Sequence, residues 1–302
     1  MKRPIFTGLC TALVTPFDGE AVNYEMLELL IERQIDAGVD AIVLTGTTGE
    51  SPTLTREEKL EIYRSGVQTA RGRCKIIAGT GSNCTANAVS LSREAEETGV
   101  DGLLIVTPYY NKSTQPGLLK HYQTICDAVR LPVIAYNVPS RTGVDILPGT
   151  ARALAEIPNL VGIKEASGNI VRVSRLADAL PVYTGNDDQT VACMALGGCG
   201  VISVVSNVLP ELTLAMVRAA QKGDFQTAAE LQWKLLPLMD LMFCQVNPIP
   251  VKAAMKMMGF GCGECRMPLD GLTEENRRRL QQCIDCVRNN LRLRCAVCCD
   301  RL

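Results

Sequence analysis

The chain has 302 residues, of which 47% are hydrophobic and 21% charged, and its formal net charge at pH 7 is −1. This hydrophobic content is enough for one large α/β domain or two average ones. The near-zero balance of interspersed charges excludes the basic surface of a nucleic-acid-binding protein or of a protein that binds anionic membranes. We therefore expect a small-molecule partner.

The first residues, "MKRPIFTGLCTALVTPFDGE", begin with basic side chains, but Thr11, Thr15 and Pro16 interrupt the apolar run that follows. We interpret them as a first strand rather than a secretion signal. No other apolar stretch reaches the ~20 uncharged residues of a membrane-spanning helix. The fourteen cysteines lack the compact framework of a small disulfide-rich domain. We expect a cytoplasmic protein with reduced thiols.

Short apolar segments recur along the chain, each followed by a polar or glycine-rich loop and a longer amphipathic stretch. In chain order they are "GLCTALVTP", "DAIVLTGTTGE", "KIIAGTGSN", "GLLIVTPYYN", "PVIAYNVPSR", "LVGIKEASG", "PVYTGND" and "GVISVVSN". Their continuous hydrophobicity predicts strands buried on both faces of a parallel sheet. Helix signals lie between them: Thr55 with Glu58 resembles a capping box, and Gly38 and Gly99 stand where helices should end.

Eight strand-helix units predict an α/β fold, a (β/α)8 TIM barrel, over residues 1–223. An open doubly wound sheet is the alternative, but no GxGxxG follows the first strand. Residues 224–302 contain three more helical patterns and few strand signals. We expect them to form a helical C-terminal extension with a cysteine-rich tail, and not an independent domain, because no linker precedes them.

Lys164 ends the sixth apolar segment, and the active site of such a barrel lies at the C-terminal ends of its strands. Lys75 begins the third segment and would point to the opposite end, and Lys112 lies out in a loop. Two interpretations of Lys164 remain open: an inner ion pair with a carboxylate such as Asp187, or a desolvated amine that forms a Schiff base with a carbonyl substrate.

Other predicted strand ends carry groups that suit carbonyl chemistry. The loop "GTTGES" offers backbone N–H groups and the hydroxyls of Thr47 and Thr48 to a carboxylate. The segments "TPYYN" and "YNVPSRTG" add tyrosines that can relay protons and an arginine that can bind a second carboxylate. We expect chemistry on a 2-keto acid without a metal, since the one histidine, His121, is predicted to lie on a helix surface.

The motifs "GTTGES", "TPYYN", "YNVPSRTG", "GIKEASG" and "GGCGVISV", in this order and spacing, resemble the 4-hydroxy-tetrahydrodipicolinate synthase family of pyruvate-dependent lyases. The resemblance extends into "NPIPVKAAMKMMG" and "RMPLDGLTEENR" and covers nearly the whole chain. It implies condensation of pyruvate with L-aspartate 4-semialdehyde in the diaminopimelate and lysine pathway. It implies no cofactor, because the covalent intermediate is an imine between pyruvate and Lys164.

The resemblance also assigns roles to further residues. Tyr136 would be the central acid/base, linked through Thr48 to Tyr110, and Tyr110 would reach in from a neighbouring subunit. The pyruvate carboxylate would rest on Thr47 and Thr48, and the aldehyde's carboxylate on Arg141. The family resemblance implies a homotetramer built from two tight dimers.

Two further positions, Gly185 and Ile202, match family residues that line the pocket and contact bound pyruvate. They follow from the resemblance alone.

The sequence departs from the family pattern in the cleft where lysine inhibits sensitive members. Arg56 and Lys59 replace histidine-type side chains and Asn87 stands in place of an acid, while Asn83 and Tyr109 are retained. More positive charge disfavours a ligand that carries ammonium groups. We expect weak or absent feedback inhibition by lysine.

Half of the fourteen cysteines follow Gly261, in "CGEC", "CIDC" and "CAVCC". Two CxxC pairs at this spacing resemble a zinc ribbon, but they lie in a loop and in a helical pattern. We favour reduced thiols and predict no metal site. The alternatives to the synthase are another pyruvate-dependent aldolase acting on a sugar acid, and a metal- or redox-responsive barrel protein.

Overall fold

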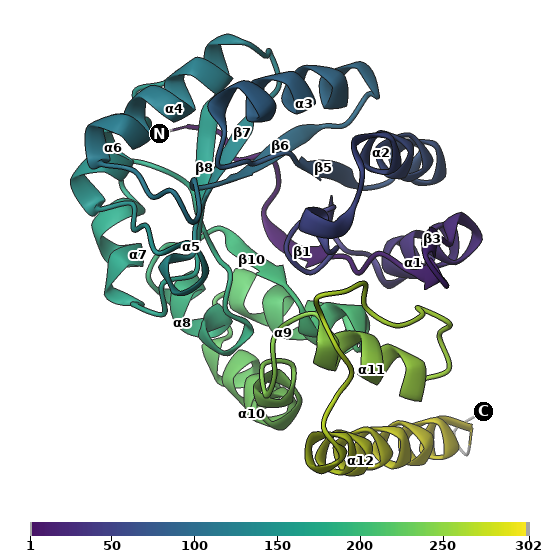
Figure 1. The fold of residues 1–302 in the computed structure, drawn as a ribbon. Helices are drawn as coiled ribbons and strands as arrows, with labels where there is room; N and C mark the ends of the chain where they lie inside the picture. The colour runs from purple at the N-terminus through teal and green to yellow at the C-terminus, as the bar shows by residue number, and fades with distance from the viewer. Residues whose placement is uncertain (1, 300–302) are drawn as a thin grey trace.

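The computed structural model describes the backbone of residues 2–299 and the side chains of residues 2–287. Eight parallel strands close into a barrel that helices surround (Figure 1). These strands are β1 (Gly8–Ala12), β4 (Ala41–Leu44), β5 (Lys75–Gly79), β6 (Gly102–Val106), β7 (Val133–Asn137), β8 (Leu160–Glu165), β9 (Val182–Thr184) and β10 (Gly200–Ser203). Nearly every strand residue is buried, as expected of strands covered on both faces. The predicted TIM barrel is confirmed.

The helices that follow the barrel strands lie on the outside of the barrel. They are α1 (Tyr24–Ala37), α2 (Arg56–Ala70), α3 (Thr85–Glu97), α4 (Gln115–Asp127), α6 (Pro148–Leu154), α7 (Val171–Leu176), α8 (Thr190–Ala195) and α9 (Pro210–Gln221). Thr55 and Glu58 form the predicted capping box at the start of α2. Gly38 caps α1 with φ 85°, a conformation that glycine adopts without steric cost.

The loops contain short elements that were not predicted from the sequence. A two-stranded hairpin of β2 (Phe17–Asp18) and β3 (Ala21–Val22) follows β1, and the one-turn helix α5 (Pro139–Thr142) follows β7. Single turns η1 (Ser51–Thr53), η2 (Asp187–Gln189) and η3 (Val205–Asn207) follow β4, β9 and β10. Segments of two to four residues are too short to show a hydrophobic period.

His121 is buried, with 5% of its surface exposed, so its predicted position on a helix surface is wrong. It lies on the buried stripe of α4, together with Leu118, Tyr122 and Ile125. These four residues occupy positions i, i+3, i+4 and i+7, which lie on one helix face. The His121 Nδ1 atom lies 2.9 Å from the Thr85 hydroxyl of α3, so a neighbouring helix covers the ring.

Two hydrophobic clusters stabilise the barrel. The smaller cluster fills the barrel interior and includes Phe6, Tyr136, Tyr183 and Ile202. The rings of Phe6 and Tyr183 stack with centroids 4.4 Å apart, and the Tyr183 hydroxyl donates to the Phe6 carbonyl. The larger cluster lies between the strands and the surrounding helices.

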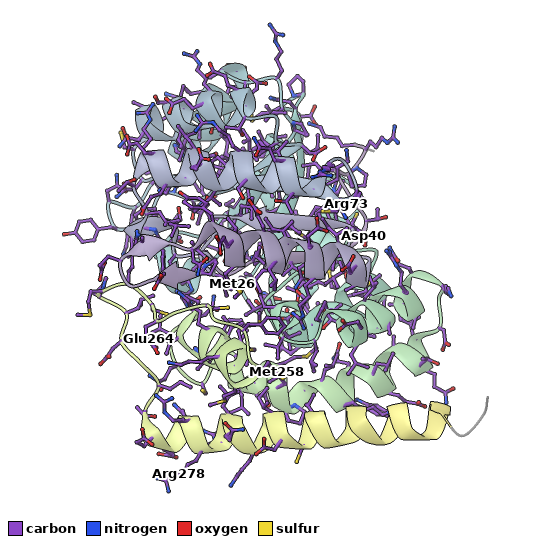
Figure 2. All side chains as sticks on the ribbon, turned by 90° about the vertical axis from the view of Figure 1, so that its right-hand side faces the viewer. Met26, Asp40, Arg73, Met258, Glu264 and Arg278 are labelled. Carbon is purple, nitrogen blue, oxygen red and sulfur yellow. The ribbon has the colours of Figure 1, made fainter. Side chains whose placement is uncertain are left out.

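The C-terminal extension consists of α10 (Phe225–Leu241), α11 (Ile249–Met257) and α12 (Glu274–Cys299). It lies along one side of the barrel (Figure 1), and α12 is the long yellow helix at the lower edge of Figure 2. Leu235, Met255 and Leu280 from these three helices belong to the same hydrophobic cluster as the barrel helices. The boundary near residue 223 stays a prediction. In the part of the chain with a described backbone, no helix is long and apolar enough to cross a membrane.

Candidate active site

Lys164 lies at the C-terminal end of β8, with only 6% of its surface exposed. In the register of the sheet it pairs with Tyr136 of β7 and with Tyr183 of β9. Gly185 leaves room for its side chain, because a Cβ atom at that position would lie 2.7 Å from the Lys164 Cε atom. Lys75, as predicted, begins β5, where it pairs with Asp101 at 2.7 Å.

The Lys164 Nζ atom lies over the Tyr136 ring, 4.4 Å from the ring centroid. Among the residues with described side chains, no carboxylate lies within ion-pair distance of this Nζ atom. Asp187, the partner of the ion-pair interpretation, accepts hydrogen bonds from the backbone N–H groups of Val204 and Val205 instead. Burial raises the pKa of this carboxyl. Lys164 and Asp187 therefore do not form the inner ion pair.

Glu165, the residue after Lys164, fixes the end of β8. Its carboxylate accepts hydrogen bonds from the Ser167 N–H group at 2.7 Å and from Asn137 Nδ2 at 3.1 Å. Arg172 approaches the same carboxylate at 3.8 Å. Since successive residues of a strand point to opposite faces, these bonds hold the backbone while leaving Lys164 directed into the barrel.

The loop after β4 presents Thr47 and Thr48 at the same rim. Two non-glycine residues with positive φ flank the threonines, Thr45 at 50° and Glu50 at 55°. The Thr45 hydroxyl lies 2.6 Å from the Tyr63 hydroxyl, and the Thr15 hydroxyl donates to the Gly49 carbonyl at 2.7 Å. Such strained backbone persists only where surrounding contacts fix it.

Arg141 reaches the same region from α5. Its Nη2 atom donates to the backbone carbonyl of Asn247 at 3.3 Å, and Asn247 Nδ2 donates to the Thr48 hydroxyl at 3.0 Å. Asn247 is buried and precedes α11, so the C-terminal extension contributes directly to this rim. Asn247 was not predicted as a site residue, because it lies 199 residues from Thr48 in the chain and no sequence motif signals their contact.

A cavity of about 930 Å³ joins these side chains. Six of the eight predicted site residues line it: Thr47, Thr48, Tyr136, Arg141, Lys164 and Gly185. One buried amine, three hydroxyls and a guanidinium thus converge on one space. This set can bind carboxylates and exchange protons with a carbonyl compound attached to the amine.

The two other predicted site residues lie apart from this cavity. Tyr110 is 92% exposed, at φ 70°, and does not line the cavity of its own chain. Ile202 is fully buried in the barrel interior, and Val204, two residues later, lines the cavity instead. The structure therefore brings six of the eight residues together within one chain.

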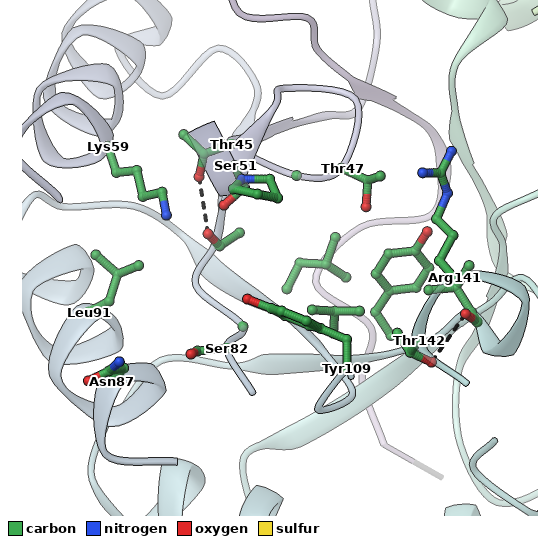
Figure 3. Close-up of a pocket in the computed structure, with 18 of the residues that line it drawn as sticks. Thr45, Thr47, Ser51, Lys59, Ser82, Asn87, Leu91, Tyr109, Arg141 and Thr142 are labelled. Atoms are coloured by element: carbon green, nitrogen blue, oxygen red, sulfur yellow. Dashed lines mark hydrogen bonds between the residues drawn. The ribbon is translucent and has the colours of Figure 1, made fainter. Parts of the chain in front are cut away.

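A second cavity of about 510 Å³ adjoins the first and shares Thr47, Tyr136 and Arg141 with it. Arg56, Lys59 and Asn87, which the sequence analysis assigned to the regulatory cleft, line this second cavity together with Tyr109. In Figure 3 the Lys59 amine and the Tyr109 hydroxyl point into the hollow.

Arg56 and Lys59, two of the three cationic side chains that line the second cavity, differ in their ion-pair partners. Arg56 forms an ion pair with Glu94. Lys59 has no acidic partner among the described side chains, and burial lowers its pKa. The cavity is therefore unfavourable for a further positive charge.

The cysteine motifs with described side chains do not assemble into a metal-binding group. Cys262 is buried, Cys265 and Cys283 are partly buried, and Cys286 is exposed. Among the described side chains, no three His, Cys, Asp or Glu residues are grouped so that they could hold a metal ion. Cys295, Cys298 and Cys299 lie outside the described side chains.

Comparisons with known proteins agree with this geometry. Residues 5–286 match the model of the dihydrodipicolinate synthetase family. The chain is 50% identical over 285 residues to the 4-hydroxy-tetrahydrodipicolinate synthase of Caldicellulosiruptor saccharolyticus, covering 93% of this chain and 97% of the relative.

Solved structures give the same result. Dihydrodipicolinate synthase from Aquifex aeolicus is 44% identical, with a TM-score of 0.92 over 94% of this chain and 98% of that chain. The chloride-inhibited synthase from Acinetobacter baumannii, complexed with pyruvate, is 43% identical, with a TM-score of 0.91 over 93% of this chain and 98% of that chain. The chain therefore belongs to the dihydrodipicolinate synthetase family and is a lyase.

Proposed function

We propose that this enzyme condenses pyruvate with L-aspartate 4-semialdehyde to form 4-hydroxy-tetrahydrodipicolinate, in the pathway to diaminopimelate and lysine. The observation that carries the proposal is Lys164, a buried amine without a carboxylate partner among the described side chains. It lines a cavity together with Arg141 and two threonines. Family membership supports the same reaction.

The covalent step begins with attack of the Lys164 amine on the C2 carbonyl of pyruvate, which loses its oxygen as water and gives an imine. Removal of a C3 proton produces an enamine, whose carbon attacks the aldehyde carbon of the semialdehyde. The new alkoxide takes up a proton and becomes the 4-hydroxyl group. The substrate's own amine then attacks the imine carbon, closes the ring and releases Lys164.

Tyr136 and Thr48 are the proposed proton carriers. Tyr136 lines the cavity and lies beside Lys164, and Thr48 accepts a hydrogen bond from Asn247 Nδ2. Because Asn247 occupies an acceptor position of the Thr48 hydroxyl, the Thr48 proton is free to be donated toward the cavity. The partner subunit's Tyr110 would complete the relay, which accounts for a tyrosine that is 92% exposed in one chain.

The two substrate carboxylates have separate partners in this proposal. The pyruvate carboxylate binds the loop with Thr47 and Thr48, and the semialdehyde carboxylate binds Arg141. Gly185 admits the Lys164 side chain to the space between them. A guanidinium suits the second site because it can bind a carboxylate through two parallel hydrogen bonds.

We propose a homotetramer made of two tight dimers, with Tyr110 crossing the tight interface. Replacement of Tyr110 by Phe should lower kcat, and mixing this variant with Lys164→Ala should restore part of the activity if the tyrosine acts across an interface.

We also propose a cytoplasmic location. It suits the cysteines, because every cysteine with a described side chain is free.

We propose that lysine inhibits this enzyme weakly or not at all. The second cavity holds Lys59 without an acidic partner among the described side chains, and Asn87 offers no negative charge to an ammonium group. Placing the two ammonium groups of lysine there is electrostatically unfavourable. Strong inhibition at submillimolar lysine would contradict this proposal.

The reaction is tested by a coupled turnover assay with pyruvate and L-aspartate 4-semialdehyde, run beside N-acetylneuraminate and a 2-keto-3-deoxy sugar acid. We expect turnover with the semialdehyde alone. Cleavage of a sugar acid without turnover of the semialdehyde would retain the imine but overturn the assignment of Arg141.

A further inference from the structure

The C-terminal extension donates hydrogen bonds to the loop of residues 46–51, which carries Thr47 and Thr48. Asn247 Nδ2 donates to the Thr48 hydroxyl at 3.0 Å, Lys252 Nζ donates to Glu50 Oε1 at 2.8 Å, and the backbone N–H of Arg266 donates to Glu50 Oε2 at 2.9 Å. Two of the three contacts meet at one side chain, the carboxylate of Glu50.

Glu50 adopts a conformation that its residue type disfavours. Its φ of 55° is left-handed, where a Cβ atom meets steric strain, and its side chain is fully buried. A buried carboxylate also requires charged or hydrogen-bonding partners, which Lys252 and Arg266 supply. These partners therefore hold the residue where it would not otherwise remain.

The Lys252 ammonium is itself fully engaged. Besides Glu50 it donates to the backbone carbonyl of Glu264 at 2.9 Å, and it lies 4.2 Å from the centroid of the Phe17 ring. Its side chain is 2% exposed. An ammonium paired in this way is unavailable as a nucleophile, and its contact with the loop of Thr47 and Thr48 is the hydrogen bond to Glu50.

The turn that carries the threonines is closed by the backbone of the same residues. The Glu50 N–H group donates to the Thr47 carbonyl at 3.2 Å, and the Ser51 N–H group donates to the Gly46 carbonyl at 3.3 Å. Only Gly49 separates Glu50 from Thr48. A displacement of the Glu50 carboxylate would therefore move both threonines.

We propose that Glu50 and Lys252 are positioning residues, whose buried pair holds the loop of Thr47 and Thr48 in the shape that binds the pyruvate carboxylate. The inference rests on the proposed function, because it takes pyruvate as the ligand of this loop. It assigns to the C-terminal extension a part in substrate binding.

Four variants test the proposal. Glu50→Gln and Lys252→Met each remove one charge of the pair, and the double variant Glu50→Met/Lys252→Met replaces both by apolar side chains of similar length. Lys256→Met is the matched control, since Lys256 lies one turn further along α11 and forms an exposed pair with Glu264.

The main measurement is the pyruvate concentration that gives half-maximal trapping of Lys164 by borohydride, which requires no aldehyde. KM for each substrate and the melting temperature are measured beside it. We expect each single variant to raise the half-maximal pyruvate concentration about tenfold or more, because small displacements of a binding group cost affinity strongly. KM for the semialdehyde should change by less than about threefold, and Lys256→Met should match the wild type.

The double variant separates positioning from simple charge burial. We expect it to regain most of the melting temperature lost by the single variants, because no unpaired charge remains, while pyruvate binding stays at least about fivefold weaker. Pyruvate binding within twofold of wild type in both single variants, or full recovery of binding in the double variant, would overturn the proposal. If the wild type traps pyruvate but does not turn over the semialdehyde, the proposed function fails while this test still stands.

Discussion

Two lysines are buried at the rim of this barrel, and their surroundings differ in one respect. Lys252 forms an ion pair with Glu50 at 2.8 Å, whereas Lys164 has no carboxylate within that reach among the described side chains and lies over the Tyr136 ring. Their exposed fractions are similarly small, 2% and 6%. Burial alone therefore does not distinguish the two lysines, and the proposed reactive lysine, Lys164, is the one without a carboxylate partner among the described side chains.

Replacing Lys164 by Met is the strongest test of this comparison. We expect turnover to fall at least about a thousandfold, because no other amine among the described side chains lines the cavity to form the imine. The free energy of unfolding should stay the same or rise, since the substitution removes a buried polar group without an ion-pair partner. Steady-state kinetics and urea unfolding of the same preparation give both values. A large loss of stability would show that Lys164 has a structural partner after all.

The same substitution at Lys252 should have the opposite balance. Lys252→Met leaves the Glu50 carboxylate buried without its cation, which typically costs about 3 to 5 kcal/mol of folding free energy. Urea unfolding measures the loss, and Lys256→Met is the exposed control on the same helix. An unchanged free energy of unfolding in Lys252→Met would remove the contrast between the two lysines.

His121 extends the comparison to a third buried basic group. Its Nδ1 atom has a partner in Thr85, its Nε2 atom has none, and burial lowers its pKa to about 4. As the pH falls, the unfolded chain therefore takes up this proton before the folded chain does. His121 does not lower the free energy of unfolding above about pH 6.5, but it lowers this free energy as the pH drops toward 4.

The contribution of His121 to that loss should be about 2 to 3 kcal/mol. The wild type and His121→Gln are compared by urea unfolding at about pH 7 and about pH 4.5. We expect the variant to lose less stability than the wild type between the two pH values. Equal losses would mean that His121 is protonated in the folded protein without cost.

Gly185→Ala probes the space that Lys164 needs and should have the smallest effect. The added methyl group would lie 2.7 Å from the Lys164 Cε atom and from the Ala166 Cβ atom, so the amine must shift. We expect kcat to fall about tenfold with little change in melting temperature. Unchanged kinetics would show that the position of the Lys164 side chain is not critical.

The sequence predicted the barrel, and it placed most of the candidate site residues at one rim, because the features that it used are local. Continuous apolar segments define the strands, and the residue at each strand end falls on the same rim, as with Lys164 and Tyr136. Contacts between distant segments left no such signal. Asn247 with Thr48, and Lys252 with Glu50, are brought together only by the folded extension. The burial of His121 and the depth of Ile202 depend on how elements pack, which periodicity does not determine.

The imine at Lys164 is tested most directly by incubating the wild-type enzyme with pyruvate, reducing it with borohydride and mapping the modified peptide by mass spectrometry. We predict one pyruvate adduct, on Lys164, and none on Lys252. Unmodified Lys164 under conditions of full turnover, or an adduct on a different lysine, would contradict it.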